Sequence, residues 1–177
     1  KPRPEYKTPT VMRVTLCDTE TGKIVSERYL RDTGTDERGN YIDGTISAPP
    51  GTYHLMAYNF DTESTHVQDK DNHFQMQVYT NPISEQLMDR LAFVRSSNET
   101  KDWNIRYEPD HFFVETCEEI VVDDKPYADT LYNHQGDHFT AESVVKTYYI
   151  QVNVKGIEYI KSAYSLLTGM AGSVQLC

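Results

Sequence analysis

The sequence is poor in cysteine and in long apolar runs, and each shortage excludes a class of protein. Its 177 residues include only three cysteines, which stand far apart at Cys17, Cys117 and Cys177, and it contains no CxxC pair. A structural zinc site of the usual spacing and a disulfide framework are therefore not supported, while the pairing of any two cysteines stays open. No apolar run reaches the roughly 18 residues of a membrane-spanning helix, so we expect no segment to span a membrane.

Positive charge is also scarce. The chain has 17 Lys and Arg against 27 Asp and Glu, which gives a formal net charge of −10. Because nucleic-acid binding needs clustered positive charge, this balance argues against a nucleic-acid partner. The stretch 108–124 carries carboxylates and no Lys or Arg, which is typical of a solvated acidic face.

Motifs for catalysis are missing. The sequence contains neither a GxSxG elbow nor a Gly-rich phosphate loop. Cys17 or Cys117 could act as a nucleophile with a distant histidine, but any chain with six histidines allows such a pairing. We therefore expect that the protein is not an enzyme.

Two loop stretches resemble metal sites without fulfilling the pattern. Asp69, Asp71 and Asn72 suggest a calcium loop, but the sixth and twelfth positions are Phe74 and Thr80, where glycine and an acidic residue are required. The other stretch contains His134 and His138 with one carboxylate between them, which lie in a loop without further ligand motifs. We expect no metal and no cofactor.

What the sequence does contain is organised around the stretch 48–59. Pro50 and Gly51 predict a type II turn, in which Gly51 supplies a positive φ. The strand that follows carries Tyr53, Leu55 and Ala57 on one face and Met56 and Tyr58 on the other. Because both faces are apolar, we expect this strand to be central in its sheet.

Period-two alternation predicts further strands on both sides of this one. They are expected at residues 11–18, 24–30, 41–47, 74–80, 103–107, 111–122 and 144–155. Polar loops are expected at residues 31–40, 61–72 and 123–137, and residues 157–177 fit either a helix or a strand–turn–strand. Ile83, Leu87, Leu91 and Val94 recur at helical spacing, which predicts one short helix over 84–95 with Ser84 as its N-cap.

About ten short strands and one helix predict a mainly β fold, an antiparallel β-sandwich. We expect the core face of the central strand, with Tyr53, Leu55 and Ala57, to pack against the cleanest alternating strand near the C-terminus. The apolar face of that strand consists of Tyr148, Ile150, Val152 and Val154.

Several short motifs resemble one protein family. They are Pro-Gly-Thr-Tyr at 50–53, Tyr-Asn-Phe-Asp-Thr-Glu at 58–63, Tyr-Glu-Pro-Asp at 107–110, and Lys-Ser-Ala-Tyr at 161–164 running into Leu-Thr-Gly-Met-Ala-Gly-Ser-Val at 167–174. Together they are similar to the fimbrillin-like cell-surface lipoproteins of Bacteroidales, a class that includes fimbrial anchor and tip subunits. The resemblance covers about residues 11–176.

The resemblance implies transthyretin-like sandwich domains, export, a lipidated N-terminal cysteine, and assembly by strand exchange into fimbriae on the outer membrane. It predicts other fimbrial subunits as partners, with host or bacterial surface ligands as further possibilities, and membrane contact only through a lipid anchor absent from this chain. It offers no catalytic motif. The domains expected are a tether at 1–10, a transthyretin-like sandwich at 11–140 and the start of a second β domain at 141–177.

The last stretch is too short for a core of its own. Its strands either fold back onto the first sandwich or form an incomplete second sandwich, which a segment of another subunit could complete by β-strand addition. We favour the second outcome and expect Tyr148, Ile150, Val152 and Val154 to form the strand-exchange interface. The alternative function is a surface glycan-binding lipoprotein, which would use Trp103 and exposed tyrosines as stacking platforms.

Overall fold

The structure is a computed structural model that describes residues 7–84, 86–87, 104–124, 139–148, 150–159, 167 and 169–176. Its elements are mostly short strands. In chain order they are β1 (Met12–Asp18), β2 (Ile24–Leu30), β3 (Asp32–Asp36), β4 (Gly39–Asp43), β5 (Gly51–Asn59), β6 (Thr65–Gln68), the 3-10 turn η1 (His73–Gln75), β7 (Gln77–Thr80), β8 (Phe113–Val122), β9 (Glu142–Ser143), the 3-10 turn η3 (Ile157–Tyr159) and β10 (Ser173–Gln175).

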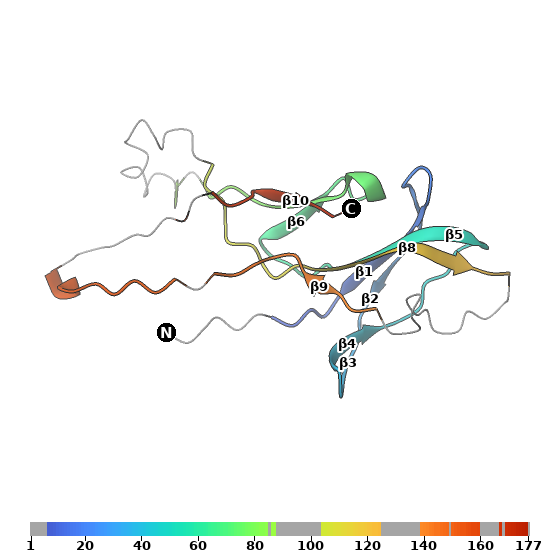
Figure 1. Cartoon of the computed structure of the whole chain (residues 1–177), viewed down its shortest axis with the longest axis horizontal. Helices are drawn as coiled ribbons and strands as arrows, with labels where there is room; N and C mark the ends of the chain where they lie inside the picture. Colours follow the sequence, from blue (N-terminus) through green and yellow to red (C-terminus); the bar gives the residue numbers. More distant parts are fainter. Residues whose placement is uncertain are drawn as a thin grey trace.

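The strands form two larger sheets and one hairpin (Figure 1). The first sheet has the order β2-β1-β5-β8-β9, and the second has the order β10-β7-β6. The strands β3 and β4 pair only with each other. All pairings between these strands are antiparallel, so the predicted mainly β, antiparallel fold class is confirmed.

The central strand is β5, as its two apolar faces predicted. It pairs with β1 along one edge and with β8 along the other. Its core-facing residues are all buried; they are Tyr53, Leu55 and Ala57 on one face and Met56 and Tyr58 on the other. A strand with no solvated face needs cover on both sides, and this need determines the layers of the molecule.

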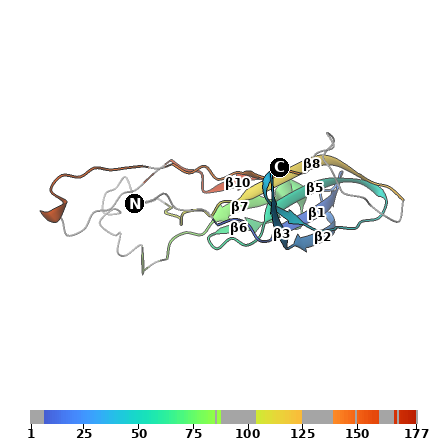
Figure 2. The ribbon, with the colours of Figure 1, turned by 90° about the horizontal axis from the view of Figure 1, so that it is seen from below.

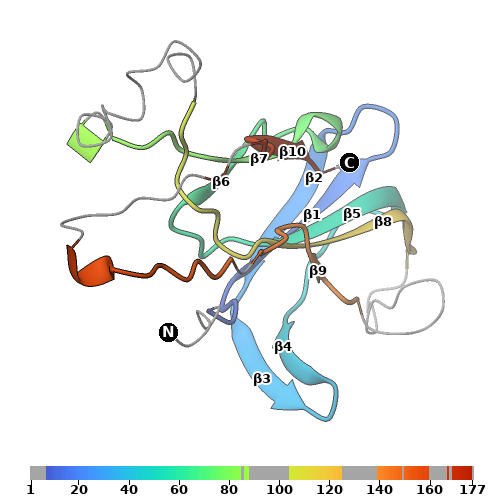
Figure 3. The ribbon, with the colours of Figure 1, turned by 60° about the vertical axis from the view of Figure 1, so that its left-hand side comes forward.

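The second sheet covers the face of β5 that carries Met56 and Tyr58 (Figures 2 and 3). Met76, directly before β7, and Val78 on β7 pack there, and the Tyr58 ring stacks on Phe112 with centroids 5.5 Å apart. The first and second sheets thus enclose one core, in the manner of a β-sandwich.

Irregular chain covers the opposite face of β5. Ile46 and Ala48, from the connection between β4 and β5, pack against the cluster around Leu55, and so does Phe139. This face is therefore closed by segments without regular strands. The transthyretin-like arrangement of the sandwich stays a prediction.

The prediction of a polar loop at 31–40 is wrong, because β3 and β4 form a hairpin there that projects from the body (Figure 3). Its turn is short: Gly39 has φ +121°, and the Arg38 amide donates to the Asp36 carboxylate at 2.8 Å. A projecting two-stranded ribbon is solvated on both faces. It therefore needs no apolar alternation, and hydrophobic periodicity cannot detect it.

The turn before β5 also differs from the prediction. Gly51 does not have a positive φ, because it already belongs to β5 and pairs with Val122. The turn is closed instead by a side chain, as the Tyr53 hydroxyl donates to the Pro49 carbonyl at 2.8 Å.

Several observed element boundaries also differ from the predicted ones. The strand predicted at 41–47 ends at Asp43, the loop predicted at 61–72 contains β6, and the strand predicted at 74–80 begins only at Gln77, after η1. Of the strand predicted at 103–107, Arg106 forms a single bridge with Pro82. In the predicted helix, the Leu87 amide donates to the Ser84 hydroxyl at 3.4 Å, as an N-cap requires, while residues 88–95 lie outside the described residues.

The C-terminal stretch contributes to both sheets. β9 pairs with β8, and β10 pairs with β7, so residues 142–143 and 173–175 lie against strands that precede residue 140. Of the two forms left open for 157–177, the described residues form η3 and β10. The predicted domain boundary near residue 140 stays a prediction.

Candidate functional site

The main candidate site is an extended segment that leaves the body of the molecule after β9. We call the described residues 146–148 and 150–155 the exposed arm (Figures 1 and 2). Its base is fixed: the Val144 amide donates to the Phe112 carbonyl at 2.9 Å, and the Val144 and Val145 side chains pack against the core between the sheets. Thr147 and His111 form a further side-chain contact at 3.3 Å. The arm is therefore held at its base.

Beyond its base the arm carries an apolar face in solvent. The exposed fractions are 63% for Tyr148, 59% for Ile150, 67% for Val152 and 44% for Val154. The expected packing of these residues against Tyr53, Leu55 and Ala57 is therefore wrong, and so is a paired strand over 144–155. Instead, the side chains of Ile46, Ala48 and Phe139 pack against that face of β5.

The arm runs as extended chain (Figure 1). The side-chain amide of Gln151 donates to the side-chain oxygen of Asn153 at 3.1 Å, so these two polar side chains lie on the same side of the arm. Lys146 and Lys155 flank the apolar face, and no carboxylate occurs between them. The positive φ of Gly156 and the turn η3 then end the extended segment.

Two of the motifs that carried the family resemblance lie together. Asp110 accepts hydrogen bonds from three consecutive backbone amides, those of Glu63 at 2.8 Å, Ser64 at 2.6 Å and Thr65 at 3.0 Å. Burial raises the pKa of the Asp110 carboxyl, but these hydrogen bonds outweigh it and hold the pKa below the ordinary value. The motifs at 58–63 and 107–110 are thus joined through one carboxylate, which indicates a structural role.

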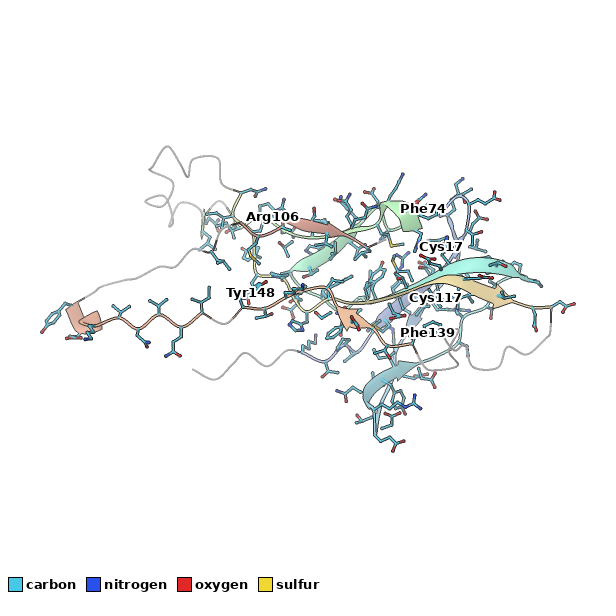
Figure 4. All side chains as sticks on the ribbon, in the orientation of Figure 1. Cys17, Phe74, Arg106, Cys117, Phe139 and Tyr148 are labelled. Atoms are coloured by element: carbon cyan, nitrogen blue, oxygen red, sulfur yellow. The ribbon has the colours of Figure 1, made fainter. Side chains whose placement is uncertain are left out.

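The motif at 167–174 has a structural role too. A Cβ atom on Gly172 would lie 2.9 Å from Nε of Arg106, so a larger residue there would require the Arg106 side chain to shift. The Arg106 guanidinium donates to the Thr80 carbonyl at the end of β7. Figure 4 shows Arg106 between these segments.

Neither described cysteine is placed for catalysis or cross-linking. Cys17 and Cys117 are buried on opposite faces of the first sheet (Figure 4). Cys17 lies opposite His54 in the strand register, but burial raises the pKa of its thiol and its sulfur lies 3.7 Å from the Thr15 hydroxyl. A protonated, inaccessible thiol is a poor nucleophile.

Other predicted sites can be tested only in part. Among the described residues no group of three His, Cys, Asp or Glu side chains could hold a metal ion, while His134 and His138 lie outside those residues. Trp103 lies outside them too. The exposed aromatic rings of the described part are spread over several elements, with one close pair, Tyr29 and Phe60, whose centroids are 5.0 Å apart.

These features define a class of molecule: an antiparallel, two-sheet β protein with an exposed apolar arm. Residues 4–177 match the family model described as Domain of unknown function (DUF5119), and the chain belongs to this family. No helix in the described part of the chain has the length and hydropathy needed to cross a membrane.

Two relatives place the chain more closely. It is 24% identical over 128 residues, 72% of its length, to the "Putative fimbrium anchoring subunit Fim4B" of Bacteroides ovatus. It is also similar in fold to a solved structure described as a "putative adhesin" from Bacteroides ovatus, with a TM-score of 0.50, 21% identity and 77% of this chain covered. The chain spans 33% of the first relative and 39% of the second. The resemblance to fimbrillin-like proteins of Bacteroidales is confirmed.

Proposed function

We propose that this chain is part of a non-enzymatic fimbrial or adhesion subunit of a bacterial surface. The similarity to a fimbrium anchoring subunit and to an adhesin supports this function. Other fimbrial subunits are then its partners. The subunit is exported to the cell surface and held at the outer membrane through a lipid that is attached outside these residues.

We further propose that the subunit assembles by β-strand addition through the exposed arm. The observation that carries this proposal is the apolar face of Tyr148, Ile150, Val152 and Val154, which is exposed on an extended, unpaired segment. Apolar side chains and unpaired backbone groups on extended chain favour pairing with the edge of another sheet. Main-chain hydrogen bonds then supply affinity, and the alternating side chains determine the register.

The two faces of the arm allow a matched test. The double variant Ile150→Ser/Val152→Ser removes apolar surface, whereas Gln151→Ser/Asn153→Ser changes the opposite face of the same segment. Each variant replaces the wild-type protein in the bacterium that carries it, and the subunit is quantified in purified fimbriae by immunoblot. We expect the first variant to be depleted from fimbriae and the second to be retained.

Assembly through the arm would be contradicted if both variants, present in whole cells at the same level as the wild-type protein, were incorporated equally into fimbriae. Absence of even the wild-type protein from fimbriae and from the cell surface would contradict the fimbrial function itself. The alternative, glycan binding, is supported only by the exposed pair Tyr29 and Phe60. Binding of surface oligosaccharides that is lost with Tyr29→Ala would favour it.

A further inference from the structure

The turn η1 lies in the connection between β6 and β7 of the second sheet and contains Phe74, which Figure 4 labels. On one side it is held by the β1–β2 turn, because the His73 amide donates to the Gly22 carbonyl at 2.7 Å. On the other side it is held next to β10, where the Gln175 side chain donates to the Phe74 carbonyl at 2.9 Å. Movement of η1 would therefore loosen the second sheet from the first.

A stack of two histidines seats η1 on the central strand. The buried ring of His73 stacks on His54 of β5, with centroids 5.1 Å apart and planes inclined by 13°. Phe74 packs edge-on against both rings, with centroid distances of 5.4 Å and 5.8 Å. Two of the three rings in this contact can take up a proton near neutral pH.

Charged residues lie on the elements next to the stack. The carboxylate that interacts with His54 is Asp18, at the end of β1, and its oxygen accepts from the Thr21 amide and hydroxyl at 2.7 Å. Opposite His54 on β1 lies the buried thiol of Cys17. Asp69, Lys70 and Asp71 precede η1 in the β6–β7 connection, and the backbone of Lys23 pairs with that of Asn72 beside them. Burial and the neighbouring His54 both disfavour a charged His73 ring.

We propose that the His54–His73 stack is a proton-sensitive latch, which holds η1 and the adjoining edge of the second sheet at neutral pH and releases them in mild acid. Two imidazolium rings in this stack would repel each other at short range with their charges largely out of water. Neutral rings pack without this penalty, so the closed form is the one that binds fewer protons.

The pKa of His73 supports this direction. Burial lowers the pKa of the His73 imidazole first, and the neighbouring His54 lowers it further. When the pKa of a histidine is lower in the closed form than its ordinary value of about 6.5, the contribution of that histidine to the stability of the closed form is complete above about pH 6.5. This contribution is lost as the pH falls below that value. The latch therefore opens from about pH 6.5 downward.

Hydrogen exchange of the His73 amide, which is bonded to Gly22, reports directly on the latch. We compare the full chain at pH 7.5 and pH 5.0, after correction for the intrinsic exchange rates. We expect opening at residues 72–76 to increase by about threefold or more in acid, since each unit of pKa difference corresponds to roughly tenfold. Amides in the pairing of β1 with β5 serve as an internal reference and should show a smaller change.

Variants separate the latch from general acid sensitivity. His54→Phe keeps an aromatic ring in the stack without a charge, and His54→Gln removes the charge where the larger ring does not fit. Either variant should reduce the acid response at residues 72–76, and His73→Phe, which removes the buried titrating ring, should abolish it. The control is His66→Gln, because His66 lies on β6 beside Asn81 and outside the stack. A wild-type protein without the response, or a folded His73→Phe variant that keeps it, overturns the proposal.

Discussion

At the scale of single residues, polar groups with several partners do much of the structural work. Arg13 on β1 is almost fully buried, and it donates to the Tyr58 hydroxyl at 2.5 Å and to the Glu27 carboxylate at 2.7 Å. Nothing in the sequence pattern indicated this, because arginine is normally exposed and the strand period only assigns a face. Asp110 is the second such residue.

Replacing Asp110 should destabilise the fold more than replacing a neighbour. Asp110→Ala leaves three amides, those of residues 63–65, without their acceptor, so we expect a loss of about 1–3 kcal/mol in the free energy of unfolding. Glu108→Ala, at an exposed position in the same loop, should change it by less than about 0.5 kcal/mol. Urea denaturation at pH 7 measures both.

The same carboxylate gives a pH dependence of defined sign. Because the pKa of Asp110 is lowered in the folded state, its contribution is complete above the unfolded value of about 4 and is lost as the pH falls through the folded value. The difference in stability between wild type and Asp110→Ala should therefore narrow below about pH 4. A constant difference down to pH 2 would contradict this role.

At the scale of elements, the sequence predicted what hydrophobic periodicity can reveal. β1, β2, β5 and β8 were found close to their observed bounds, because each buries an alternating face against a neighbour. The hairpin β3–β4 was missed because it buries little. The segment 144–155 has the best alternation of all, yet it is unpaired in the described structure. Alternation shows that a segment suits a sheet edge, but it does not reveal whether its own chain supplies that edge.

The central strand should be the element most sensitive to truncation of a side chain. Leu55 on β5 is 3% exposed, so Leu55→Ala should lower the free energy of unfolding by about 2–5 kcal/mol. Val25 on the edge strand β2 is 44% exposed, and Val25→Ala should cost less than about 1 kcal/mol. If chemical denaturation gave the same loss in the free energy of unfolding for both variants, β5 would not be the centre of the core.

At the scale of the whole molecule, the second sheet depends on residues from the far end of the chain. Leu176, directly after β10, is 8% exposed among Met56, Met76 and Phe112, and its amide donates to the Met76 carbonyl at 3.1 Å. The sequence left this stretch ambiguous, because a three-residue strand is too short for its period to be recognised.

This placement predicts that two substitutions in or next to β10 lower the free energy of unfolding by unequal amounts. Leu176→Ala should lower the free energy of unfolding by about 2–5 kcal/mol, because it opens a cavity between the sheets. Val174, two residues earlier on β10, is 44% exposed, and Val174→Ala should cost less than about 1 kcal/mol. The comparison uses thermal unfolding of the full chain. A neutral Leu176→Ala variant would show that β10 does not complete this core.

The placement of the two buried thiols has a consequence for how the sheet is made. Cys17 and Cys117 lie on opposite faces of the first sheet, and Cys117 belongs to the core cluster around Leu55. The sheet thus stands between the two sulfur atoms, and no native bond between them locks the pairing of β1, β5 and β8. A disulfide isomerase therefore has no native bond to sort between these two positions.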